Sequence, residues 1–133
     1  MKKTGIIISA ILTLVMVLSS CTEENDLLND GESRDAFLGS WSVSDACSKQ
    51  SYGVNISADP SNFSVVQISN FANLGRTASG VIAGTSIIVE SQDVGNGYSV
   101  SGSGRLNGSI ISWSTYNYAD SGNSYDCTAT FSK

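Results

Sequence analysis

Apolar and polar side chains alternate along this chain from residue 39 onward, a pattern typical of half-buried β-strands. The alternating runs cover residues 39–48, 51–58, 63–70, 75–82, 85–91, 97–106, 109–118 and 124–132. In one of them Tyr52, Val54 and Ile56 share one side, while Asn55 and Ser57 share the other. No helical periodicity follows the first twenty residues, so the pattern predicts an all-β domain of eight short strands.

Residues suited to tight turns separate these strands. Asn107-Gly108 predicts a two-residue type I′ hairpin, and further turns are expected at 59–62, Gly84, 95–97 and 120–123. Short strands joined by hairpins favour an antiparallel meander that curls into a small eight-stranded barrel. An open β-sandwich is the alternative.

The two cysteines of this domain, Cys47 and Cys127, are predicted to form a disulfide. Cys47 shares its strand parity with Trp41, and Cys127 shares its parity with Phe131, so both cysteines should point inward. Their bond would join the first strand to the last and cover both edges of the sheet. Two buried free thiols are the alternative.

The start of the chain has a different pattern. Lys2 and Lys3 precede an apolar run over residues 6–18, which as a helix would span about 20 Å, short of the ~30 Å hydrocarbon core of a bilayer. This favours a secretory signal over a membrane span. The run ends in Leu18-Ser19-Ser20-Cys21, which resembles the lipobox of bacterial lipoproteins. The resemblance implies cleavage before Cys21 and acylation of Cys21 with chains such as palmitate, whereas a plain signal peptide is the alternative.

Residues 21–35 carry six acids against one base, Arg34, and predict a flexible tether. Thr22 stands where an Asp would retain a lipoprotein at the inner membrane, so the lipoprotein resemblance implies the outer membrane. Thr22-Glu23-Glu24 is also similar to the acidic run of surface-exported lipoproteins in some Gram-negative bacteria; a solvated spacer is the simpler interpretation. The side of the membrane, periplasmic or cell-surface, stays open.

The remaining residues, 36–133, form one predicted domain with six acids and four bases. It has no basic stripe of the kind that binds phosphates, so a nucleic-acid partner is not expected. Gly39-Ser40-Trp41 resembles the G-x-W start of lipocalin-like barrels, which implies that Trp41 packs across the closed end. The whole chain also resembles small uncharacterised bacterial lipoproteins with a Ser/Thr/Gly-rich β domain. At this size, the domain's own side chains can fill such a barrel.

Candidates for catalysis are few. The chain has no histidine, so an ordinary serine or cysteine triad is not expected. Glu90 and Asp93 border a turn, where acids usually only interact with solvent. Asp120, Asn123 and Asp126 match no calcium loop. We therefore expect neither an enzyme nor a bound cofactor or metal.

Recognition is suggested by residues 113–125, which place Tyr, Ser, Asn and Gly around a hairpin tip, a composition common in binding loops. Ordinary strand and turn composition is the alternative. The candidate ligand-binding residues are Tyr116, Asn117, Tyr118, Asp120, Asn123 and Tyr125. If Ile111 and Trp113 face inward, strict alternation turns Tyr116 and Tyr118 outward, whereas the opposite register would bury both tyrosines.

These features predict a non-catalytic, lipid-anchored envelope protein that binds a glycan or a protein. Residues 121–125 read Ser-Gly-Asn-Ser-Tyr and resemble the S-G-x-x-Y motif of periplasmic lysozyme inhibitors. An inhibitor of a hydrolase is therefore one alternative, and a structural envelope component is another. The sequence leaves the oligomeric state open.

Overall fold

The computed structural model describes residues 33–133. The predicted signal peptide (1–20), the predicted lipidation site Cys21 and the predicted tether as far as residue 32 lie outside the described residues. Within residues 33–133, no helix is long and apolar enough to cross a membrane.

The described residues form nine strands, one short 3₁₀ helix and a helical turn at residues 33–35, and the strands are close to the predicted ranges. The strands are β1 (Gly39–Asp45), β2 (Tyr52–Ala58), β3 (Val65–Ser69), β4 (Ala78–Ala83), β5 (Ser86–Gly95), β6 (Tyr98–Asn107), β7 (Ile110–Ala119), β8 (Ser124–Tyr125) and β9 (Ala129–Ser132), and the helix is η2 (Phe71–Asn73).

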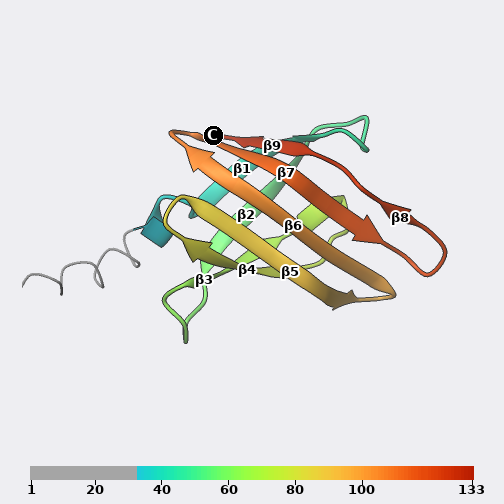
Figure 1. Cartoon of the computed structure of the whole chain (residues 1–133), viewed down its shortest axis with the longest axis horizontal. Helices are drawn as coiled ribbons and strands as arrows, with labels where there is room; N and C mark the ends of the chain where they lie inside the picture. The colour runs from blue at the N-terminus through green and yellow to red at the C-terminus, as the bar shows by residue number, and fades with distance from the viewer. Residues whose placement is uncertain (1–32) are drawn as a thin grey trace, which may run out of the picture.

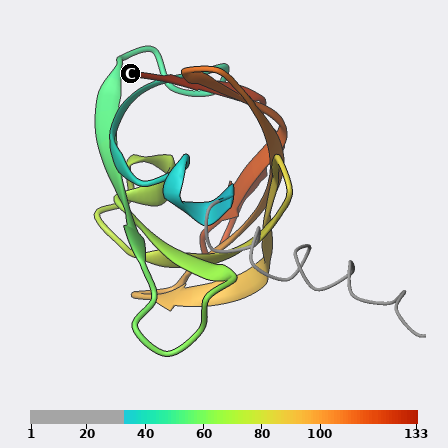
Figure 2. The same ribbon diagram turned by 90° about the vertical axis from the view of Figure 1, so that its left-hand side faces the viewer.

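The strands close into the predicted antiparallel barrel. Each strand from β1 to β7 pairs with the next, β7 pairs with β9, and β9 pairs with β1. Eight strands therefore complete the ring, and β8 is an additional strand beside the far end of β7. Figure 1 shows the strands as a meander, and Figure 2, which views the left-hand end of Figure 1, shows the closed ring. Because every barrel edge is paired, the sandwich alternative is wrong.

The hairpin turns lie close to their predicted positions, although the one predicted at Asn107-Gly108 is shifted by one residue and differs in type. Gly108 and Ser109 connect β6 to β7, and of these two only Gly108 has a positive φ. This fits a type II′ turn rather than the predicted type I′, which requires positive φ at both positions. Asn96 and Gly97, between β5 and β6, do both have positive φ and fit type I′.

Aromatic side chains fill the barrel interior. The largest fully buried side chains include Trp113, Tyr116, Phe37, Phe71 and Phe131. Trp113 contacts three of the others, with ring centroids 5.7 Å from Phe71, 5.4 Å from Tyr116 and 5.1 Å from Phe131. The barrel is therefore packed with its own side chains, as its small size predicts.

One end of the barrel, here called the entry end, is where residues 33–38 lead into β1. Residues 33–35 form a helical turn that lies across the barrel opening in Figure 2, and Phe37 is fully buried. The Trp41 indole N–H donates to the Phe37 carbonyl at 2.8 Å. Lys133 covers the Trp41 ring, with Nζ 4.3 Å from the centroid. Trp41, which follows Gly39 by two residues, thus packs at this end as the lipocalin resemblance implies.

Arg34, which falls in the predicted tether, contacts the barrel. Its Nη1 lies 2.8 Å from the Asn62 carbonyl oxygen, in the loop between β2 and β3, and its guanidinium lies 5.9 Å from the centre of the Phe63 ring. The last three residues of the predicted tether therefore belong to the turn that packs on the entry end.

The predicted last strand, 124–132, is interrupted. β8 pairs with the end of β7 and β9 pairs with its beginning, and residues 126–128 between them are not in a strand. We call the opposite end of the barrel the disulfide end, because Cys127 lies in this interruption.

Candidate binding site at the disulfide end

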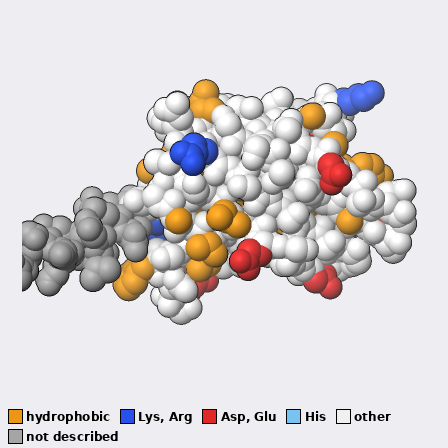
Figure 3. Space-filling view, in the orientation of Figure 1, with side chains coloured by type: hydrophobic (Ala, Val, Ile, Leu, Met, Phe, Trp, Pro, Cys, Tyr) orange, Lys and Arg blue, Asp and Glu red, His pale blue; other side chains and the backbone are white. Residues whose placement is uncertain are grey.

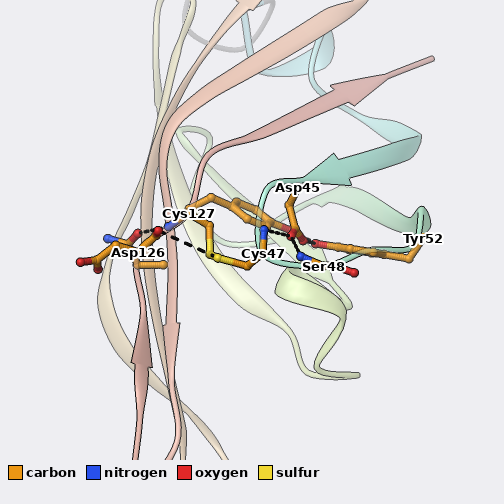
Figure 4. Close-up of a disulfide and its surroundings, with 8 residues drawn as sticks. Asp45, Cys47, Ser48, Tyr52, Asp126 and Cys127 are labelled. Atoms are coloured by element: carbon orange, nitrogen blue, oxygen red, sulfur yellow. Dashed lines mark hydrogen bonds between the residues drawn. A yellow bond between two sulfur atoms is a disulfide. The ribbon is translucent and has the colours of Figure 1, made fainter.

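Cys47 and Cys127 form the predicted disulfide, with Cα atoms 5.8 Å apart. Cys47 follows β1 and Cys127 precedes β9, so the bond ties together two neighbouring strands at the disulfide end. Figure 4 shows Asp45 and Tyr52 beside this bond. Asp45 is buried, and its carboxylate accepts hydrogen bonds from the Cys47 amide, the Ser48 amide and the Tyr52 hydroxyl. These bonds satisfy a carboxylate that would otherwise be costly to bury.

The Tyr52 hydroxyl connects this carboxylate to the interior. Its oxygen lies 3.1 Å from the Tyr116 hydroxyl oxygen, which in turn accepts the Ala72 amide hydrogen at 2.9 Å. Burial raises the pKa of both hydroxyls above the ordinary value for tyrosine, and at Tyr52 the neighbouring Tyr116 and the bond to Asp45 raise the pKa further. The three polar side chains therefore act as one hydrogen-bonded support for the disulfide end.

Tyr116 is fully buried, so the prediction that it points outward is wrong. Ser103 pairs with Thr115, but the adjacent Gly104 pairs with Trp113, which leaves Ser114 as an extra residue in β7. Such a β-bulge reverses the alternation of the residues beyond it. Trp113 faces inward as predicted, and the bulge turns Tyr116 inward as well.

Tyr118 and Tyr125 form a stacked pair at the rim. They are paired residues of β7 and β8, and their ring centroids lie 4.7 Å apart at an interplanar angle of 24°. Tyr118 also pairs with Val100 of β6, which is buried, so both tyrosines lie on the face that continues the barrel interior. Tyr118 is half-buried, whereas Tyr125 is 38% exposed. The prediction that Tyr118 points outward is therefore also wrong, because it faces the same way as Tyr116 and packs partly against the core. Of the three tyrosines predicted to bind a ligand, Tyr118 and Tyr125 keep some surface at the rim.

Asn117 lies on the opposite face of β7, paired with Ser101. Its Oδ1 accepts the Cys127 amide hydrogen at 3.1 Å, and the Tyr116 amide donates to the Cys127 carbonyl at 2.9 Å. Asn117 therefore bridges the interruption between β8 and β9. Its side-chain oxygen therefore serves the fold rather than a ligand.

Asp120 and Asn123 shape the hairpin tip between β7 and β8. The Asp120 Oδ1 accepts the Gly122 and Asn123 amide hydrogens at 2.9 and 2.8 Å, and the Asp120 amide donates to the Asn123 carbonyl at 2.9 Å. These backbone hydrogen bonds lower the pKa of the Asp120 carboxyl below its ordinary value. The tip is thus held in one conformation, which lowers the entropy cost of binding.

A shallow hollow of about 210 Å³ borders the same hairpin. It is lined by serines from three strands, by Asn117 and by the two rim tyrosines, and the serines are Ser91, Ser99, Ser101 and Ser124. The strand register places Ser99, Ser101, Ser124 and Asn117 on the sheet face opposite Tyr118 and Tyr125. At this edge of the sheet, a polar ligand can therefore meet hydroxyl and amide groups from one face and an aromatic ring from the other. We refer to the rim pair and this hollow as the rim site.

The structure adds no evidence that Glu90 and Asp93, the two acids considered for catalysis, have a catalytic role. Asp93 accepts the Gly95 amide hydrogen at 2.8 Å and so shapes the turn at the end of β5, beyond Glu90. Among residues 33–133, no three His, Cys, Asp or Glu side chains are grouped closely enough to hold a metal ion.

Comparison with known proteins adds no assignment, because no family model, curated protein or solved structure matches the chain.

Proposed function

We propose that this protein is a lipid-anchored envelope protein that binds a glycan through its rim site and performs no catalysis. The observation that carries the proposal is the Tyr118–Tyr125 pair, stacked at the end of the barrel beside a hollow that four serines also line. One face of each ring is covered by the other tyrosine, and Tyr125 keeps more than a third of its surface exposed. A sugar ring can stack on an aromatic face while its hydroxyls bond to Ser and Asn side chains.

The surrounding structure supports recognition. The disulfide, the Asp45–Tyr52–Tyr116 hydrogen bonds and the Asp120 turn hold the rim site in place from three sides. A site that is ordered before binding loses little conformational entropy when its ligand arrives. The lipobox resemblance supports the anchor at Cys21, which would hold the rim site at the envelope.

The test is binding of the purified mature protein to an array of bacterial envelope glycans, including peptidoglycan fragments and lipopolysaccharide O-chains. The Tyr118→Ala, Tyr125→Ala double variant should lose binding at least tenfold, because aromatic side chains carry much of the energy of such sites. Phe63→Ala is the matched control, since it removes an exposed aromatic side chain at the entry end and should bind normally. Equal binding by wild type and the double variant would contradict the proposal.

The anchor has its own test. Cells that make the protein should incorporate labelled palmitate into it, and Cys21→Ala should abolish the label. Acyl labelling of the Cys21→Ala variant would exclude the proposed site of lipidation.

A second candidate function, inhibition of a hydrolase such as lysozyme, is favoured by the hairpin tip. Residues 120–126 are all exposed, and β8 and the tip project at the right of the domain in Figure 1. A rigid projecting hairpin can enter an enzyme cleft. Lysozyme assayed with a molar excess of the protein separates the two candidates, because a glycan-binding protein leaves the turnover of a soluble substrate unchanged.

A further inference from the structure

The entry end of the barrel carries most of the exposed apolar surface among the described residues. Five large hydrophobic side chains are more than a third exposed. Four lie in the half of the barrel near the entry end, and only Tyr125 lies at the disulfide end. The four are Phe63 (77% exposed), Val81 (43%), Ile88 (42%) and Ile110 (41%).

The strand pairing shows why these residues lie at the same end, around the ring of strands. β1 begins at the entry end, and β2, β4, β6 and β9 end there because neighbouring strands are antiparallel. Phe63 is in the loop after β2, and Ile110 follows the turn after β6. Val81 and Ile88 are paired residues on the outer face of β4 and β5. Figure 3 shows hydrophobic side chains grouped on the lower left of the domain, near the point where the chain enters it.

Charge is divided in the same direction. Three bases lie at the entry end with two acids, and four acids lie at the disulfide end with two bases; a seventh acid, Glu90, lies near the middle of β5. The entry-end group is Arg34, Arg105 and Lys133 with Asp35 and Asp59; the disulfide-end group is Asp45, Asp93, Asp120 and Asp126 with Lys49 and Arg76. Basic side chains around apolar ones suit the surface of an anionic bilayer, whereas the five acids of residues 22–32, which precede this end in the sequence, oppose that attraction. The apolar side chains therefore carry more of the argument than the charges.

The bilayer is the partner that we infer for this surface, because the predicted lipid is attached close to the entry end in the sequence. Cys21 is twelve residues before Ser33, where the described chain begins at the entry end. As the flexible tether that the sequence predicts, a chain of that length has an average span of roughly 20 Å, so acyl chains on Cys21 would keep the entry end near the lipid. At such an effective concentration, a contact too weak to bind alone becomes occupied.

We propose that the entry end rests on the bilayer, with Phe63 inserted among the lipid headgroups and with Arg34, Arg105 and Lys133 facing anionic lipid. The proposal rests on the lipid anchor of the proposed function. It gives the barrel a fixed orientation: the disulfide end, with the Tyr118–Tyr125 pair, faces away from the membrane that carries the protein. The rim site is then open to ligands in the adjacent compartment.

The experiment places one tryptophan at each end of the full mature protein in vesicles of phosphatidylethanolamine and phosphatidylglycerol. Phe63→Trp reports on the entry end, and Tyr125→Trp is the matched control at the other end. The native Trp41 and Trp113 are each 2% exposed and give both variants the same background. Lipids with brominated acyl chains should quench the Phe63→Trp signal at least twofold more than the Tyr125→Trp signal, and iodide in the water should show the reverse preference.

Equal quenching of the two variants by brominated lipid, in vesicles that carry the protein, would overturn the proposed orientation. Failure of the anchor has two separate signs. The mass of the mature protein then lacks acyl chains, and the protein does not float with the vesicles. In that case the same two variants are coupled through the Cys21 thiol to maleimide-bearing lipid, which is selective because Cys47 and Cys127 are bonded to each other. The orientation is then tested without the native lipid.

Discussion

Trp113 and Tyr116 are three residues apart on β7, yet both point into the barrel, with ring centroids 5.4 Å apart. Residues separated by an odd number normally lie on opposite faces of a strand. The bulge at Ser114 removes that constraint by adding one residue to β7 opposite Ser103 and Gly104. It therefore places a hydroxyl-bearing aromatic ring in the interior, where it bonds to the Ala72 amide.

Tyr116 should consequently be a stability residue. Tyr116→Phe keeps the ring but leaves the Ala72 amide without its acceptor, which should cost about 1–3 kcal/mol. Tyr116→Ala also empties the space of the ring and should cost about 3–5 kcal/mol. Urea unfolding followed by near-ultraviolet circular dichroism measures both. Two variants as stable as wild type would show that Tyr116 contributes little to the core.

Alternation along the sequence is sufficient to predict most of the fold, because each strand buries one side of a regular pleat. It predicts the closed eight-stranded barrel and the bond between Cys47 and Cys127, both of which the structure confirms. Both cysteines, however, lie just outside the strands whose parity predicted the bond. A bulge is different, since it depends on the neighbouring strand. Nothing in residues 113–118 alone shows that Ser114 has no partner in β6.

The candidate site was accordingly only partly predictable. The hairpin and its turn follow from local residues, and Tyr118 and Tyr125 do lie at its surface. The burial of Tyr116 and the hydrogen bond from the Cys127 amide to Asn117 were not predictable. They arise where the bulge in β7 lies beside the interruption between β8 and β9. The serines of the hollow come from β5, β6 and β8, so they are brought together only by closure of the sheet. Gly102 and Gly104 were a missed signal, since two glycines on one face of β6 indicate that a large side chain lies against it.

Those two glycines make room for the indole of Trp113. A Cβ atom at Gly104 would lie 2.9 Å from a ring carbon of Trp113, and a Cβ atom at Gly102 would lie 2.8 Å from the Thr115 carbonyl oxygen. Gly102→Ala and Gly104→Ala should each destabilise the protein by about 1–3 kcal/mol through overpacking. Thermal unfolding measures the loss as a lower Tm.

Gly53→Ala is the matched control for the two glycine variants. Gly53 is also in a strand, β2, but its Cβ would meet nothing closer than the Trp41 carbonyl oxygen at 3.7 Å, an ordinary contact distance. Its stability should change by less than about 0.5 kcal/mol. If all three alanine variants lose the same stability, the close packing of β6 against Trp113 is not the cause.

The disulfide should carry a large share of the stability. It spans 80 residues of sequence, and closing a loop of that size in the unfolded chain corresponds to ~4–5 kcal/mol on the chain-entropy model. A whole domain is typically stable by ~5–15 kcal/mol. The Cys47→Ser, Cys127→Ser double variant should therefore melt at a much lower temperature than wild type. Two native thiols that alkylate freely in the oxidised wild-type protein would contradict the bond itself.

The buried tyrosine hydroxyls predict a loss of stability in alkali. Burial raises the pKa of Tyr116 above its ordinary value of 10.0, so the unfolded chain releases this proton at a lower pH than the folded protein. The stability due to the neutral hydroxyl is complete below pH 10 and declines as pH rises beyond it, by about 1.4 kcal/mol per pH unit for one group.

Tyr116→Phe removes that group. Urea unfolding between pH 8 and 11 should show a variant that is less stable at pH 8 but loses stability less steeply above pH 10 than wild type. Parallel curves for the two proteins would show that Tyr116 ionises in the folded state as readily as in the unfolded chain.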